Sequence, residues 1–212
     1  LIDQGYLCPL QYLDETIIEH EEIPLNKSES DFDLERYEDK ISSRQERILE
    51  VIEHAKSIAK SVLVFCSSVR QAEGLAKIVS CADVVTANTP KRERDLIIGA
   101  FRSGGTQVVF NVGVLTLGFD HPGLDCVVLL RPTRSIGLYY QMVGRGLRTA
   151  EGKKYCNVID LTSTVRNLGK VETIKLIRRE KWELESERGS WHNAELYSFM
   201  FKKNENTNTE SR

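Results

Sequence analysis

Two arginines in the second half of the chain have the spacing of a phosphate clamp. Arg145 and Arg148 end the stretch Gln141–Arg148, which reads Q-M-V-G-R-G-L-R and places Gly144 and Gly146 on either side of the first arginine. Residues three apart share one face of a helix, so we expect both guanidinium groups to project together. Each planar guanidinium can donate two parallel hydrogen bonds to phosphoryl oxygens, and the glycines permit close approach to the backbone. The alternative is a solvated basic helix end.

Basic side chains are in excess in only one part of the sequence. The 212 residues carry a formal net charge of −2, so no overall field draws the chain to nucleic acid. Between residues 131 and 154, however, six basic side chains stand against one acidic side chain, Glu151. Any contact with nucleic acid is therefore expected to be local.

The cysteines and the hydropathy limit the class of protein. Five cysteines are scattered without a C-x-x-C pair, which indicates neither a zinc site nor a disulfide framework. No apolar run approaches eighteen residues. We expect a soluble cytoplasmic protein with no metal ligands of its own and no contact with a membrane. The chain opens on Leu1 rather than Met, and we expect it to be part of a longer protein.

The elements that must position the arginines alternate along the chain. Short apolar runs, rich in β-branched residues, predict strands buried on both faces at 62–66, 108–110, 125–130 and 155–160, with a weaker candidate at 82–86. Helical patterns fill the gaps at 43–59, 68–79 and 90–101. This alternation predicts an α/β fold, a three-layer doubly wound domain with a mainly parallel central sheet.

The flanks of that domain are less regular. We expect residues 1–40 to be an interdomain linker and N-terminal extension that continues into the sheet, followed by the α/β domain at 41–170. Residues 171–203 mix charges with Ile174, Leu176, Ile177 and Trp182, which predicts a helical extension. Residues 204–212 are polar and are expected to be a disordered tail.

Four blocks, in order, resemble a known family. The pattern V-x-x-x-T-x-G-F-D at 112–120 and R-P-T-x-S-x-x-x-Y-x-Q-x-V-G-R-G-L-R at 131–148 resemble motifs V and VI of superfamily 2 helicases. Val62–Ser68 resembles motif IV, and 88–101 resembles the segment that follows it. The wording is similar to that of bacterial RadD-type DNA-repair helicases. The resemblance implies a RecA-like domain, of the P-loop NTPase type, that forms the C-terminal half of a helicase.

The resemblance also implies roles for individual residues. Arg145 and Arg148 would be arginine fingers that stabilise charge on a transferring phosphoryl group, with Gln141 aligning the phosphate or the water. Gly118, Asp120 and Gly144 would lie at the nucleotide. Contacts to phosphates of one nucleic-acid strand would come from Ser67, Ser68, Thr89, Thr116 and Arg134. Simpler alternatives stay open: Asp120 and Thr116 as turn caps, Ser67 and Ser68 as helix N-caps, and Arg134 as a solvated side chain.

The enzymology depends on what the sequence does not contain. No G-x-x-x-x-G-K-[ST] occurs; Gly152-Lys153-Lys154 fails because Leu147 stands where the first glycine belongs and Lys154 where Ser or Thr belongs. We therefore expect ATP and Mg²⁺ to bind only in the full-length protein, between this chain and an upstream RecA-like domain, and this chain alone to be inactive.

Several functions remain open at this point. The favoured prediction is the C-terminal domain of an ATP-dependent DNA helicase or translocase that acts in repair on single-stranded or duplex DNA. The alternatives are an RNA helicase, a restriction-type motor subunit, and an inactive nucleic-acid-binding module. No residue reads the 2′-hydroxyl in a way that would separate DNA from RNA.

Overall fold

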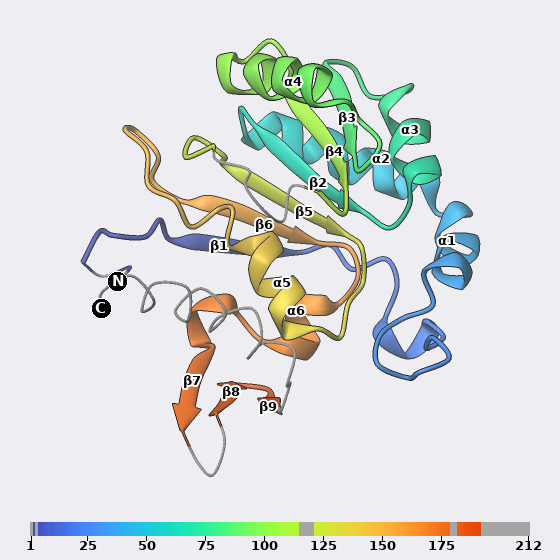
Figure 1. Ribbon diagram of the computed structural model, residues 1–212, viewed down its shortest axis with the longest axis vertical. Helices are drawn as coiled ribbons and strands as arrows, with labels where there is room; N and C mark the ends of the chain where they lie inside the picture. The colour runs from blue at the N-terminus through green and yellow to red at the C-terminus, as the bar shows by residue number, and fades with distance from the viewer. Residues whose placement is uncertain (1, 3, 115–120, 179–181, 192–212) are drawn as a thin grey trace, which may run out of the picture. The chain divides into compact units, whose positions relative to one another are not determined.

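Six parallel strands form one sheet (Figure 1). The computed structural model describes residues 2, 4–114, 121–178 and 182–191, and the chain divides into two compact units, 1–167 and 168–212. The sheet of the first unit has the order β1-β6-β5-β2-β4-β3, with every neighbouring pair parallel. Its strands are β1 (Leu10–Asp14), β2 (Val62–Cys66), β3 (Ala82–Thr86), β4 (Val108–Val112), β5 (Cys126–Leu130) and β6 (Cys156–Asp160).

The strands are where the apolar runs predicted them because they are covered on both faces. Every residue of β2, β5 and β6 is buried, so these strands need no alternation of polar and apolar side chains. The predicted α/β class with a mainly parallel sheet is confirmed. The strand at 82–86, the weakest of the predictions, is an edge strand and is more exposed at its start.

Helices connect β1 to β2, β2 to β3, β3 to β4 and β5 to β6, and another helix follows β6. They are α1 (Leu34–Ser42), α2 (Gln45–Ile58), α3 (Val69–Ala76), α4 (Lys91–Ser103), α5 (Ile136–Val143) and α6 (Thr164–Leu168), together with the short 3₁₀ turns η1 (His20–Glu22) and η2 (Val171–Thr173). None of the described helices is long and apolar enough to cross a membrane. Ser68 and Ser135 each accept a hydrogen bond from a backbone N–H and so begin α3 and α5.

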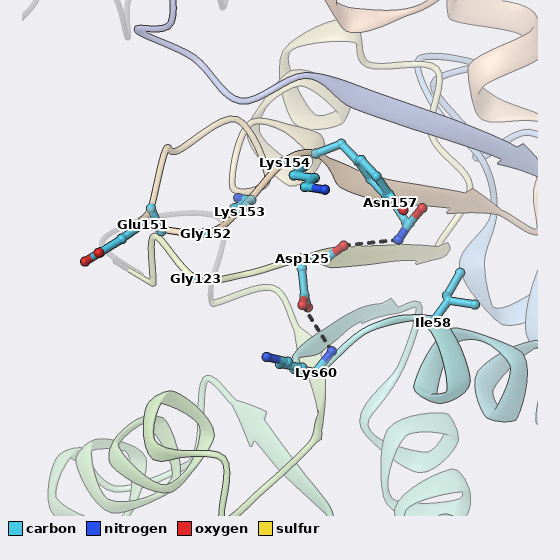
Figure 2. A pocket seen from close by; sticks show the side chains of 11 residues that line it. Ile58, Lys60, Gly123, Asp125, Glu151, Gly152, Lys153, Lys154 and Asn157 are labelled. Atoms are coloured by element: carbon cyan, nitrogen blue, oxygen red, sulfur yellow. Dashed lines mark hydrogen bonds between the residues drawn. The ribbon is translucent and has the colours of Figure 1, made fainter.

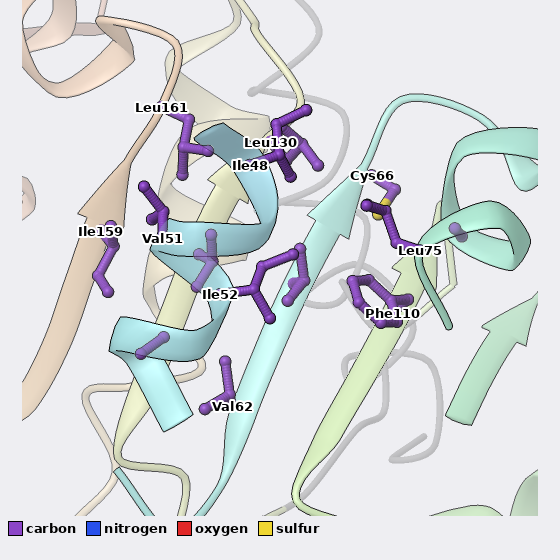
Figure 3. Close-up of a cluster of buried hydrophobic side chains, with 14 of the residues drawn as sticks. Ile48, Val51, Ile52, Val62, Cys66, Leu75, Phe110, Leu130, Ile159 and Leu161 are labelled. Atoms are coloured by element: carbon purple, nitrogen blue, oxygen red, sulfur yellow. The ribbon is translucent and has the colours of Figure 1, made fainter. Parts of the chain in front are cut away.

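The core has a separate part on each side of the sheet. Figure 3 shows Ile48, Val51 and Ile52 of α2 against residues of the neighbouring strands, such as Val62 and Ile159. Alternate residues of a strand point to opposite faces, and α5 crosses the other face (Figure 1). Tyr139 of α5 is fully buried there while Tyr140 is 47% exposed. Four of the five cysteines, Cys8, Cys66, Cys126 and Cys156, are buried.

Part of the N-terminal segment belongs to the central sheet. β1 pairs with β6 in register from Leu10↔Cys156 to Asp14↔Asp160, and Tyr37 of α1 donates a buried hydrogen bond of 2.9 Å to the carbonyl of Leu130. The first compact unit spans 1–167, and it includes the segment 1–40 that the sequence predicted as a linker and extension continuing into the sheet. The sequence understated this segment because β1 is an edge strand of five residues with only partial burial.

The predicted helical extension is wrong in its described part. Residues 175–191 form an antiparallel sheet of β7 (Lys175–Arg178), β8 (Trp182–Ser186) and β9 (Gly189–Trp191). Charged residues alternate with apolar ones in Trp182-Glu183-Leu184-Glu185, which is a strand pattern, and Lys175 stands directly opposite Glu185 as an opposite-charge pair. The expectations for 192–203 and for the tail at 204–212 lie outside the described residues.

A chain of hydrogen bonds fixes the end of β6 to the N-terminal segment. The ring Nε2 of His20 lies 3.2 Å from Thr164 Oγ1. Thr164 Oγ1 lies 2.9 Å from Thr162 Oγ1, and Thr162 Oγ1 in turn donates to the Asp160 carboxylate at 3.0 Å. Burial lowers the pKa of His20 to about 4, and burial raises the pKa of Asp160 to about 6. The imidazole is therefore neutral in the folded protein near pH 7.

The buried position of His20 should make the stability of the protein depend on pH. Because the folded pKa of His20 lies below the unfolded value of 6.5, the unfolded state takes up the proton first, and the contribution of His20 to stability is lost as the pH falls from about 6.5 to about 4. We expect His20 to account for a loss of about 2 kcal/mol across that range after allowance for solvent screening. Urea unfolding of wild type, His20→Gln and, as control, His54→Gln on the exposed side of α2 measures it. A His20→Gln profile as steep as that of wild type would contradict this assignment.

Candidate functional site

The two arginines lie on a turn and not on a helix. α5 ends at Val143, and Gly144 is its C-cap, with its N–H donating to the carbonyl of Tyr140. Arg145 follows in a turn over residues 144–147, and Arg148 comes directly after it. The prediction that they project from one helix face is therefore wrong: Gly144 and Gly146 lower helix propensity at this point, and the chain must leave α5 to reach β6.

Close packing holds this turn against the sheet. A Cβ atom added to Gly146 would lie 2.6 Å from Sγ of Cys156, the first residue of β6. The carbonyl of Leu147 accepts a 2.7 Å hydrogen bond from the N–H of Cys8, two residues before β1. The arginine turn, defined here as residues 144–148, thus lies at the amino ends of β1 and β6.

Lys153, which follows the arginine turn in sequence, also binds its main chain. The Nζ atom of Lys153 donates to three main-chain carbonyls, at 2.8 Å to Gly146, 2.7 Å to Arg148 and 3.2 Å to Pro122. Pro122 is just beyond the stretch at 112–120 that resembles motif V. Pro122 and the arginine turn, about 25 residues apart in sequence, are therefore joined through one ammonium group.

The guanidinium of Arg145 is half-buried. Its Nε donates to the carbonyl of Gln141 at 3.3 Å, which ties the side chain to the last turn of α5. Burial lowers the pKa of Arg145 from its usual value, yet an arginine remains charged near neutral pH. Both Gln141 and Arg148 are partly exposed. This arrangement gives a cation that is tied to α5 and only partly exposed.

Three predicted site residues cannot be placed. Thr116, Gly118 and Asp120 lie outside the described residues, and the described chain resumes at His121. Gly144, the remaining residue predicted at the nucleotide, is the C-cap of α5, with φ of −57°.

The predicted nucleic-acid contacts lie at the carboxyl edge of the sheet. Ser67 and Ser68 follow β2, and Thr89 follows β3. Ser67 Oγ donates to Gln71 Oε1 at 3.1 Å, and this donation engages its hydroxyl hydrogen. Ser68 Oγ accepts from the N–H of Gln71, and Thr89 Oγ1 accepts from the N–H of Thr86 at 2.9 Å. An accepting hydroxyl can still donate to a phosphate oxygen.

Two arginines follow β5 at the same edge. Arg134 is exposed; its guanidinium donates to the carbonyl of Glu29 at 3.0 Å, and its backbone N–H donates to Asp31. Arg131 is more buried, burial lowers its pKa, and its buried Nε has no hydrogen-bond partner among the described residues. The serines, Thr89 and these arginines are thus near one edge, while the arginine turn is near the amino ends of β1 and β6.

The donor groups of the arginine turn suit a phosphate. Guanidinium groups present planar N–H pairs to phosphoryl oxygens, whereas Lys153 directs its ammonium at the main chain. No group of three His, Cys, Asp or Glu side chains that could hold a metal ion gathers within 4–114, 121–178 or 182–191.

The fold and this site define the class, a RecA-like helicase domain without a phosphate-binding loop. The chain belongs to the helicase conserved C-terminal domain family, whose model matches residues 43–150, and it is the C-terminal domain of a superfamily 2 helicase. A Saccharomyces cerevisiae protein named "Putative ATP-dependent helicase IRC3" is 34% identical over 168 residues, which cover 76% of this chain and 24% of that protein. The chain thus spans about a quarter of that relative.

Two further comparisons concern a second relative and a solved structure. A Schizosaccharomyces pombe protein named "Putative mitochondrial ATP-dependent helicase irc3" is 34% identical over 121 residues, 55% of this chain and 20% of that protein. The fold is shared with a fragment described as "a putative HsdR subunit of a type I restriction enzyme" from Vibrio vulnificus. That similarity has a TM-score of 0.62 at 22% identity and covers 80% of this chain and 35% of that one.

Sequence reasoning missed Lys153. Its neighbourhood, Gly152-Lys153-Lys154, attracted notice only as a failed phosphate-binding loop. The available signal was the sequence Ala150-Glu151-Gly152-Lys153, which is typical of a reverse turn; the structure shows the Lys153 N–H donating to the Ala150 carbonyl and Gly152 at φ +75°. A reverse turn directly after the arginines brings the next side chain back toward them.

Proposed function

We propose that this domain supplies Arg145 and Arg148 as arginine fingers to an ATP site that it shares with a preceding RecA-like domain of the same protein. The observation that carries the proposal is the arginine turn itself. Its main chain is fixed by Cys8 and Lys153, and it presents one half-buried and one partly exposed guanidinium. Fixed cations of this kind stabilise charge that develops in a transition state, because they need no reorganisation during the reaction.

The residues of this chain would bind and orient the nucleotide. ATP with its Mg²⁺ supplies the phosphoryl group, and hydrolysis needs groups of the preceding domain. Arg145 and Arg148 would bind the terminal phosphate, and Gln141 would align that phosphate or the attacking water. Gly144 lets the nucleotide approach the backbone, while Gly118 and Asp120 are proposed to line the site on the motif V side.

The carboxyl edge would bind a nucleic-acid strand through its phosphates. Ser68, Thr89, Thr116 and Arg134 are the proposed contacts, with Ser67 holding Gln71 in place at the start of α3. Contacts to phosphates position a strand without reading its sequence. We propose DNA as the strand and repair as the process, on the wording of motifs V and VI and on their similarity to DNA-repair helicases.

ATP turnover by the full-length protein tests this function. We expect turnover that single-stranded DNA stimulates, and no turnover by residues 1–212 alone, since this chain has no phosphate-binding loop. Stimulation by single-stranded RNA and not by DNA would support the helicase function and show that its substrate is RNA. A full-length protein that binds nucleic acid and hydrolyses no ATP under either condition would overturn the proposal in favour of an inactive binding module.

A further inference from the structure

Lys153 is placed to hold both segments that would meet the nucleotide. An ammonium group has three N–H donors and no acceptor. Here three main-chain carbonyls, those of Pro122, Gly146 and Arg148, lie within 3.2 Å of Nζ. We propose that Lys153 is a positioning residue for the arginine fingers, which rests on the function proposed above. It acts through the main chain of the arginine turn and does not touch the nucleotide.

The geometry separates Lys153 from an ordinary basic surface residue. The side chain of Lys153 is partly buried, whereas Glu151, Gly152 and Lys154 are exposed. Figure 2 shows Lys153 and Lys154 adjacent on this turn, beside a cavity of about 320 Å³ that is also lined by Lys60 and Asp125. Because three carbonyls already accept its three donors, Lys153 has no donor to spare for a phosphate. A phosphate-binding role is therefore excluded while these contacts last.

The carbonyls that Lys153 binds explain what its loss would change. Two of them, from Gly146 and Arg148, belong to the arginine turn, and the one between them, from Leu147, is bound by the N–H of Cys8. The third, from Pro122, follows the stretch that resembles motif V. Without the ammonium, the turn keeps its contact to Cys8 and loses the link to Pro122. The guanidinium groups would then no longer be held at a fixed position relative to Pro122 and the segment before it.

Steady-state ATP turnover by the full-length protein tests the proposal. A displacement of about 1 Å can lower a rate by about 100-fold, so we expect Lys153→Ala to lower kcat by 10- to 100-fold. We expect KM for ATP to change by less than about threefold, because the ground-state contacts lie elsewhere. Lys154→Ala, the matched control one residue away, should retain wild-type kcat. Lys153→Arg should recover most of the activity, since a guanidinium can also donate to several carbonyls.

A second measurement does not depend on activity. Hydrogen exchange of residues 144–150 should be faster in Lys153→Ala than in wild type or Lys154→Ala. If Lys153→Ala proves unstable, Lys153→Met keeps the aliphatic stem and permits the same comparison.

Wild-type kcat and exchange in a folded Lys153→Ala or Lys153→Met protein would overturn this inference. A rise in KM with kcat unchanged would overturn it as well, because that result indicates direct binding of the nucleotide. The two proposals can be contradicted separately. If Arg145→Ala abolishes turnover and Lys153→Ala leaves it unchanged, only the proposed role of Lys153 is wrong. If Arg145→Ala is fully active, the proposed arginine-finger function is wrong.

Discussion

Replacing Arg145 by alanine in the full-length protein should lower ATP turnover by about 10³-fold or more, and Arg148→Ala should act in the same direction. An arginine finger typically contributes a factor of about 10³ to 10⁵ to phosphoryl transfer. The guanidinium of Arg145 is tied to the carbonyl of Gln141, and the turn that carries it is bound at Leu147 and by Lys153. A cation so restricted contributes mainly where charge develops. We therefore expect kcat to fall while the affinity for ATP stays within about tenfold.

The control for this experiment is a cation outside the turn. Lys154 is exposed and close in sequence, so Lys154→Ala has a similar effect on net charge and should leave kcat unchanged. ATP binding measured by titration calorimetry separates loss of binding from loss of catalysis. Arg145→Ala and Arg148→Ala proteins that both turn over ATP at the wild-type rate would show that this turn does not reach the reacting phosphate.

The second large effect should come from a single methyl group at Gly146. The added Cβ of Gly146→Ala would lie 2.6 Å from Sγ and 3.1 Å from Cβ of Cys156, and 3.3 Å from the carbonyl oxygen of Val143. Cys156 is fully buried at the start of β6, so it cannot move aside easily. We expect the variant to lose about 1–3 kcal/mol of stability through overpacking and roughly 100-fold in turnover through displacement of the arginine turn.

Two comparisons make this prediction specific. Gly74 lies in α3, and a Cβ added there meets nothing within 4 Å, so Gly74→Ala should be neutral or stabilising. Adding Cys156→Ala to Gly146→Ala removes the sulfur that clashes and should restore part of both the stability and the turnover. Urea unfolding and ATP turnover of the four proteins measure this, and a Gly146→Ala protein as active as Gly74→Ala would contradict it.

The sheet could be predicted from the sequence because its strands are buried on both faces. Continuous apolar runs such as Val62–Cys66 leave few alternatives, and β2 begins and ends where the run does. β1 was harder to recognise, because Leu10–Asp14 is a half-exposed edge strand that depends on pairing with a strand about 145 residues later. The strands at 175–191 were mistaken for a helix because single apolar residues among charges fit both periods over so short a length.

The candidate site was predictable in its residue types and not in its geometry. The order of Gln141, Arg145 and Arg148 indicated phosphate chemistry, but the end of α5 at Val143 depends on how the chain must turn to reach β6. The role of Lys153 depends on carbonyl groups, which every residue possesses and no sequence pattern marks.

The hydrogen bond between the Cys8 N–H and the Leu147 carbonyl connects the N-terminal segment of this domain directly to the arginine turn. Residues just before β1 are the last part of any connection from a preceding domain, and the Cys8 N–H is attached directly to the main chain between the two arginines. Tension on such a connection would reach the arginine turn across one hydrogen bond of 2.7 Å. We therefore expect a pull from upstream to affect the placement of the guanidinium groups.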